Sequence, residues 1–85
     1  MGQGRNFVEG TVTADTDWAE LVAFDKNRDA LTIFNTGAVT ALIGFTEANA
    51  ISLIAGASIS FDPAPINAVG CKTSSGTTTL VAWYA

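Results

Sequence analysis

Short apolar segments separated by turn residues are the feature that most constrains what this chain can fold into. In NRDALTIFNTG, residues 27–37, a charged turn leads into alternating apolar residues, and Asn-Thr-Gly ends the alternation. Leu31 and Ile33 share one face of such a strand and Phe34 falls on the other, because strand side chains alternate. The segment therefore predicts an exposed turn, a half-buried strand and a tight reversal.

The same pattern recurs along the chain. We expect strands near residues 7–13, 18–24, 30–35, 39–45, 51–54, 57–62, 66–72 and 77–84. Many short strands with turn residues between them are typical of sandwiches and barrels rather than of β-α-β folds. The sequence thus predicts an all-β fold, a compact antiparallel β-sandwich or jelly-roll-like barrel of about eight short strands. Residues 16–24 also fit a short amphipathic helix capped by Thr16.

Several small or polar residues are expected to form the turns. The predicted turn residues are Asn27, Arg28, Asn35, Gly37, Gly56 and Gly76. Gly37 is expected to adopt a positive φ, which glycine does at no steric cost. Gly44 lies inside a predicted strand and indicates a bulge or a close backbone approach. Ile59 and Phe61 are expected to point inward.

Length and charge favour an assembled protein. The chain has 85 residues, and we expect one β domain over residues 8–85 with a flexible amino-terminal arm over residues 1–7. A monomer of this size buries only about 63% of its unfolded surface, and oligomerisation is a common remedy. Charged residues make up 14% of the chain, which indicates a surface partly covered by other chains. A compact domain with few charges is the alternative.

Several function classes lack the residues they need. The chain contains no histidine, and its single cysteine, Cys71, lies in an apolar run where a buried structural thiol is expected. We therefore expect no enzyme, no metal and no cofactor. Four scattered basic residues and a net charge of −4 indicate neither nucleic-acid nor membrane binding. No signal peptide or transmembrane run is visible, which fits synthesis in a reducing cytoplasm.

Two local motifs suggest chemistry. DKNRD, residues 25–29, matches the start of a calcium loop, but Ala30 stands where the loop needs glycine and Thr36 where it needs glutamate. Trp18 stands near three carboxylates, a grouping that a sugar-binding module would use. Those carboxylates are Asp15, Asp17 and Glu20. A solvated polar turn is the alternative for the two aspartates.

The two ends of the chain are candidates for subunit contacts. The predicted interface residues are Gly2, Gly4, Arg5, Phe7, Trp83 and Tyr84. We expect residues 1–7 to lie across a neighbouring subunit, because ordering a glycine-rich arm needs contacts that one small domain does not supply. Trp83 and Tyr84 fall on opposite faces of the last strand. Either both pack on their own domain or one of them anchors a contact.

The order of elements resembles a group of small proteins encoded among the structural genes of tailed bacteriophages. The matching residues are Asn27, Arg28, Leu31, Ile33, Asn35, Gly37, Gly44, Leu53, Gly56, Ile59, Phe61, Ser75, Gly76, Thr77 and Val81. The resemblance covers roughly residues 8–84 and implies a small β-sandwich virion component. We expect a capsid decoration or cement protein on the virion surface, made in the host bacterial cytoplasm. It would act as a homotrimer bound to the major capsid protein.

Two alternatives remain open at this point. One is a tail or head fibre accessory protein of the same kind of particle. The other is a carbohydrate-binding module on the virion surface, because β-sandwiches often carry such sites.

Overall fold

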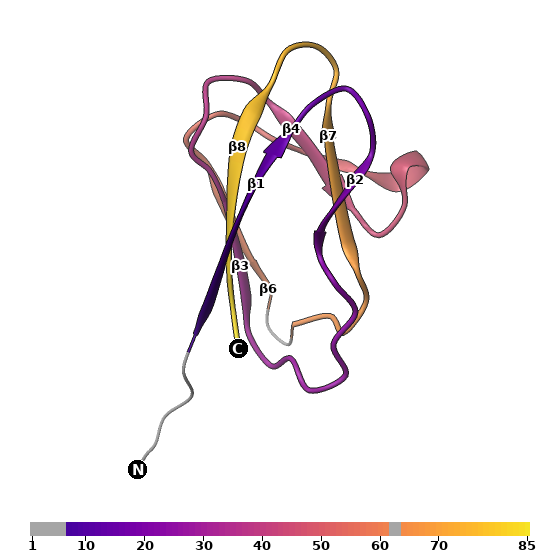
Figure 1. Ribbon diagram of the computed structural model, residues 1–85, viewed down its shortest axis with the longest axis vertical. Coiled ribbons are helices and arrows are strands. Elements are labelled where there is room, and N and C mark those ends of the chain that lie inside the picture. Colours follow the sequence, from indigo (N-terminus) through magenta and orange to yellow (C-terminus); the bar gives the residue numbers. More distant parts are fainter. Residues whose placement is uncertain (1–6, 62–63) are drawn as a thin grey trace.

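The computed structural model describes residues 7–61 and 64–85, and within those ranges the chain forms β-strands and one short 3₁₀ helix (Figure 1). The elements are β1 (Val8–Ala14), β2 (Ala19–Val22), β3 (Leu31–Asn35), β4 (Ala41–Gly44), η1 (Glu47–Asn49), β5 (Ile51–Leu53), β6 (Ser58–Phe61), β7 (Val69–Thr73) and β8 (Thr78–Tyr84). The predicted all-β class is confirmed. Gly2, Gly4 and Arg5 of the predicted arm lie outside the described residues, whereas Phe7 is described and exposed.

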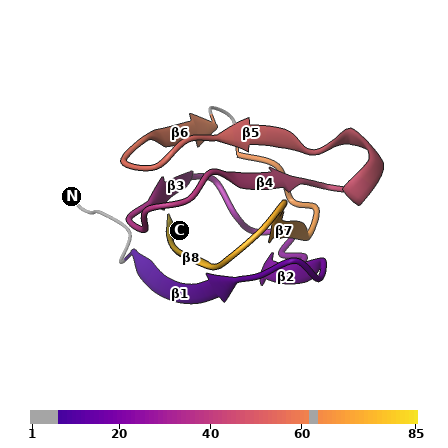
Figure 2. The ribbon, with the colours of Figure 1, turned by 90° about the horizontal axis from the view of Figure 1, so that it is seen from above.

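The strands form two antiparallel sheets that face each other (Figure 2). The first sheet has the order β1-β8-β3-β6, and the second has the order β2-β7-β4-β5. Apart from β4 and β5, which pair in the second sheet, consecutive strands lie in opposite sheets, and β1 lies beside β8 and β2 beside β7. This is the strand order of a jelly roll, in which two Greek keys fold over each other.

The hydrophobic core lies between the sheets. Its largest fully buried apolar residues are Leu31, Ile33, Ile43, Val69 and Leu80. The expected alternation holds in β3, where the residues on the inward face are buried and those on the outward face are only half-buried. Ile59 and Phe61 of β6 also pack against the core, as predicted. Cys71 is buried on β7, in agreement with a structural thiol.

The segment at residues 16–24 contains the strand β2 and no helix. Ala19 and Glu20 pair with β7, and the register then shifts before Val22. This bulge allows two consecutive apolar residues, Leu21 and Val22, to be buried together, which a regular strand does not predict. Pairing with the neighbouring strand therefore overrides the local helical pattern.

The turn glycines have different structural roles. Gly56 and Gly76 have φ angles of 81° and 73°, which disfavour any other residue. The expectation of a positive φ at Gly37 is wrong, because only Gly56 and Gly76 among the described residues adopt one. A Cβ at Gly37 would instead collide with Thr78 and would lie 2.7 Å from the backbone nitrogen of Thr79. Gly37 is thus a site of close backbone approach.

Gly44 shows the close approach that was predicted for it. A Cβ there would lie 3.1 Å from the Cα of Ala50, so β4 and the segment after η1 are in near contact. The approach brings η1 back toward its own strand. It shapes the hairpin formed by β4, η1 and β5, which protrudes from the second sheet (Figure 1).

Arg28 is a buried anchor and more than a turn residue. Its side chain is only 3% exposed, and its guanidinium donates to three backbone carbonyls. The distances are 2.9 Å to Ala23 and Pro65 and 2.6 Å to Asn67. Arg28 therefore joins the β2–β3 connection to the segment that precedes β7. Asn27 has a local role, because its backbone N–H donates to Asp25 Oδ1 at 2.9 Å.

Asn35 anchors the opposite end of the sandwich. Its buried amide Nδ2 donates to the carbonyls of Val39 and Leu53 at 2.8 and 2.9 Å. Its Oδ1 accepts hydrogen bonds from Gly37 N at 3.2 Å and from Thr78 Oγ1 at 2.7 Å. One side chain thus connects the end of β3 to three segments, the β3–β4 connection, β5 and β8, which explains why an asparagine ends β3.

Candidate functional site

An apolar hollow opens between the protruding hairpin and the rest of the sandwich. It has a volume of about 340 Å³. Its lining is formed by Ile43, Gly44, Phe45, Thr46, Asn49, Ile51, Phe61 and Val69. The residues come from both sheets, because Phe61 belongs to β6 and the others lie on or beside the second sheet. We call this surface the apolar hollow.

Pairing of β4 with β5 places two residues of the apolar hollow on one face of the second sheet. Ile43 faces Ile51 across this pair, and both side chains point to the inner face of the second sheet. Ile43 is buried in the core, but Ile51 remains 49% exposed. Phe45 is 54% exposed at the rim. The inner face of the hairpin is therefore a piece of core that its own chain leaves uncovered.

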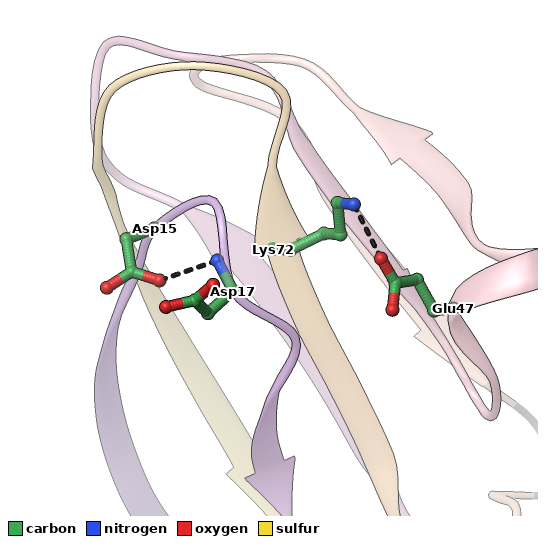
Figure 3. Close-up of polar contacts among 4 residues, drawn as sticks. All are labelled: Asp15, Asp17, Glu47 and Lys72. Carbon is green, nitrogen blue, oxygen red and sulfur yellow. Dashed lines mark hydrogen bonds and ion pairs between the residues drawn. The ribbon is translucent and has the colours of Figure 1, made fainter.

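An ion pair fixes the position of η1 beside the sheet. Lys72 Nζ lies 2.6 Å from Glu47 Oε2, so that β7 is tied to the first residue of η1 (Figure 3). Lys72 is the register partner of Leu42 on the neighbouring strand β4. This position places the Lys72 ammonium on the outer face of the second sheet. The Glu47 carboxylate is more than half exposed, so this ion pair contributes little to the free energy of unfolding. Its main role is to hold η1 in place beside β7.

A second hollow of about 160 Å³ adjoins the first, since Phe45 borders both. Trp18 and Glu20 line it, and the Trp18 ring lies directly over Gly70, where any Cβ would collide with it. This close packing of Trp18 on Gly70 gives the indole a structural role. Phe45 and Trp18 together extend the apolar surface from the hairpin to β2.

The predicted sugar-binding grouping is only partly assembled. Asp15 and Asp17 do not line the hollow beside Trp18. Asp15 Oδ1 instead accepts a hydrogen bond from the backbone N–H of Asp17 at 2.9 Å (Figure 3). This is the solvated polar turn that was the alternative reading of the two aspartates. No cluster of three or more residues able to hold a metal ion occurs within residues 7–61 and 64–85.

An aromatic group on the outer face of the first sheet is better defined. Trp83 is 46% exposed, and its Nε1 donates to Glu9 Oε2 at 3.0 Å. The Phe34 ring meets the Trp83 ring edge-on, with centroids 6.1 Å apart and planes at 69°. A shallow hollow of about 260 Å³ lies here, bordered also by Thr36 and Val81. Sequence reasoning identified Trp83 but missed Glu9 and Phe34, which only strand register brings beside it.

Trp83 and Tyr84 have separate environments, as their alternation predicts. Tyr84 is partly buried and packs against the core, whereas Trp83 points outward. Phe7 is 60% exposed, just before β1. Of the predicted interface residues that the structure describes, Phe7 and Trp83 are therefore accessible to a partner and Tyr84 is mainly structural.

Burial also determines the chemistry of the single thiol. The pKa of Cys71 is raised above its usual value, first because burial disfavours the thiolate and second because the Asp15 carboxylate repels it. Cys71 therefore stays protonated at neutral pH and is a poor nucleophile.

Comparison of the chain with protein-family models, with curated proteins and with solved structures finds no match. Among the residues that the structure describes, no helix has the length and apolar character needed to span a membrane.

Proposed function

We propose that this chain is a non-enzymatic virion structural protein that decorates and stabilises a phage capsid, with the major capsid protein as its partner. The observation that carries the docking part of this proposal is the apolar hollow, because Phe45 and Ile51 leave core-like surface uncovered in a chain with few charges. Burying such surface against a partner stabilises the complex. The assignment of the partner to a phage shell rests on the sequence resemblance.

The mechanism would be stabilisation by mass action. A protein that binds the assembled shell, and not its free subunits, lowers the free energy of the shell by the free energy of binding. Many equivalent sites on one particle multiply this effect. A jelly roll suits this task because viral capsid proteins use the same architecture, although the architecture is shared with lectins and cupins and does not determine function.

Binding to capsids that lack the protein tests the proposal. We expect the wild-type protein to cosediment with such capsids and to raise their melting temperature, and we expect Phe45→Ser and Ile51→Ser each to weaken retention at least tenfold. Phe24→Ser is a matched control, because Phe24 is 62% exposed but does not line the apolar hollow. Equal retention of all variants would contradict docking through the hollow.

Copy number and native mass test the remaining parts. Hundreds of copies per virion support a capsid location, whereas tens or fewer support the tail or fibre alternative, because shells and tails have different symmetry. The resemblance implies a homotrimer, and native mass spectrometry of the free protein measures this directly.

Saccharide binding is a second candidate function, favoured by one observation. Trp83 offers an exposed ring that Glu9 and Phe34 hold in a fixed orientation, in a hollow that Thr36 also lines. Sugar C–H groups stack on the negative face of such a ring, while carboxylates accept bonds from sugar hydroxyls. A glycan array would show binding that Trp83→Ala removes and Ile54→Ser, at another exposed position, retains. Absence of binding on the array would exclude this candidate.

A further inference from the structure

The free edge of β1 has the properties of an intermolecular pairing strand. Within the described residues, the two sheets end in four edge strands, β1 and β6 in the first sheet and β2 and β5 in the second. Exposed edges can pair with other chains, so proteins usually shorten, bulge or charge them. The four edges of this protein differ sharply in these protections.

Three edges are blunted and one is not. β5 has three residues, β6 has four, and β2 has four with a register shift between Glu20 and Val22. β1 has seven residues and pairs with β8 in an unbroken register from Val8 to Ala14. Its sequence, VEGTVTA, contains no proline, no lysine and one charge. It is therefore long, regular and weakly charged at a free edge.

The register shows which backbone groups face outward. Ala30 and Ala85 exchange both of their backbone hydrogen bonds, at 3.0 and 3.1 Å, and Thr36 N donates to Thr79 O at 3.0 Å. Because hydrogen-bonded pairs alternate along an antiparallel ladder, the odd-numbered residues of β8 bond to β3 and the even-numbered ones to β1. The even-numbered residues of β1 are their partners. The N–H and C=O groups of Glu9, Thr11 and Thr13 consequently point away from the sheet.

We propose that two copies of this chain pair through their β1 strands, antiparallel and around a twofold axis at Thr11. In this register Thr11 faces Thr11 of the second copy and Glu9 faces Thr13. All six outward N–H and C=O groups of each copy therefore form hydrogen bonds. The next symmetric registers, in which the twofold axis passes through Gly10 or Val12, form only four hydrogen bonds between the outward groups of Glu9, Thr11 and Thr13. The edge is therefore self-complementary, and the two first sheets join into one continuous sheet.

Charge permits this pairing. Glu9 is the one charged residue of β1, and it faces a threonine in the proposed register. The two Glu9 carboxylates are four residues apart along the strands, or about 14 Å at about 3.4 Å per residue. That separation exceeds the screening length of about 8 Å at physiological salt. The pairing also covers Val8, which is half exposed in the single chain.

The inference does not rest on the capsid assignment, and its dimer differs from the homotrimer that the resemblance implies. A specific pair of variants tests it. Thr11→Pro removes an outward donor while leaving the hydrogen bonds to β8, and Ser60→Pro makes the same change on β6. Sedimentation of the full chain at protein concentrations up to about 1 mM, which detects even weak association, should show a monomer–dimer equilibrium. Thr11→Pro should raise the dissociation constant at least tenfold and Ser60→Pro should leave it unchanged.

Hydrogen exchange of the wild-type protein provides a readout that does not depend on how well the variants fold. The amides of Glu9, Thr11 and Thr13 should be protected at high protein concentration and exchange quickly in dilute solution. The amides of Gly10 and Val12 should be protected at both concentrations, because they bond to β8. A monomer at every concentration, a trimer insensitive to Thr11→Pro, or exchange of the odd-numbered amides that does not depend on concentration would overturn the inference. The capsid proposal would survive any of these results.

Discussion

Thr78 Oγ1 donates a buried hydrogen bond of 2.7 Å to Asn35 Oδ1, and this contact joins the end of β3 to the start of β8. It is the central link of a network that also binds the carbonyls of Val39 and Leu53. The Asn35 side-chain amide makes all of these hydrogen bonds, with Nδ2 as the donor and Oδ1 as the acceptor. Such a network is stabilising only while it is complete, because buried polar groups without partners cost free energy.

Replacing Asn35 should therefore strongly destabilise the fold. We expect Asn35→Ala to lower the free energy of unfolding by roughly 2–4 kcal/mol, since several buried polar groups lose their partners. Asn49→Ala is a suitable control, because its amide makes one exposed side-chain contact at 3.4 Å. Urea unfolding measures both. Equal effects at the two positions would show that the Asn35 network contributes little.

Gly37 should be intolerant of a methyl group. In Gly37→Ala the new Cβ meets the backbone at Thr79, and we expect a loss of about 1–3 kcal/mol, typical of overpacking. Gly10→Ala places its Cβ 3.9 Å from the Tyr84 ring, an ordinary contact, and should be nearly neutral. Thermal unfolding compares the two variants. If Gly10→Ala is as destabilising as Gly37→Ala, the close approach is not the cause.

Arg28 should not be replaceable by lysine. A lysine ammonium is a point charge and does not reproduce the planar fork that reaches three carbonyls at once. We expect Arg28→Lys to lower stability by about 1–3 kcal/mol, or several degrees in melting temperature for a domain of this size. Lys26→Met, in the same connection but exposed, should change the melting temperature little.

The buried thiol should make stability fall at alkaline pH. Folding raises the pKa of Cys71 above its ordinary value of 9.0, so the unfolded chain loses this proton first as pH rises. The free energy of unfolding is therefore unaffected by this group below pH 9 and decreases as pH rises toward the folded pKa. Cys71→Ala should be less stable overall but show a shallower decline above pH 9. Parallel declines in the two proteins would exclude a contribution from the thiol.

The amino-terminal arm remains a prediction, because residues 1–6 lie outside the described part of the chain. Deletion of residues 1–6 should change the melting temperature little and should weaken retention on capsids. The expected reason is that the arm makes its contacts in the assembly and not in its own domain. An unfolded truncated protein, or one that binds capsids as well as the full chain does, would show that the arm expectation is wrong.

Local patterns in the sequence predicted most of the strands but few of the site residues. Alternation in ALTIFN correctly assigned Leu31 and Ile33 to the core, because one face of a strand has a simple period. The hydrogen bond between Trp83 and Glu9 could not be predicted in this way, since it depends on the register of β1 with β8, 74 positions apart in the sequence. Arg28 was identified as a turn residue, but its burial depends on distant carbonyls.

The apolar hollow was not visible in the sequence for a related reason. Ile43 and Ile51 have the same alternating pattern as core residues elsewhere, but Ile43 is buried whereas Ile51 is 49% exposed. Helix η1 carries no strong helix signal and is positioned by contacts such as the Lys72–Glu47 ion pair. The sequence pattern indicates which residues are apolar, whereas the packing of the two sheets determines which of them remain exposed.

The position of β8 between β1 and β3 has a consequence for synthesis of the protein. Of the described strands it is the last to be translated, yet it supplies the hydrogen bonds that join β1 to the rest of the first sheet. Until Thr78–Tyr84 has emerged, β1 has no neighbour in its sheet. The edges of β1 and β3 that later pair with β8 stay open until then. Folding of this domain is therefore completed after translation of β8, and the nascent chain carries open strand edges until that moment.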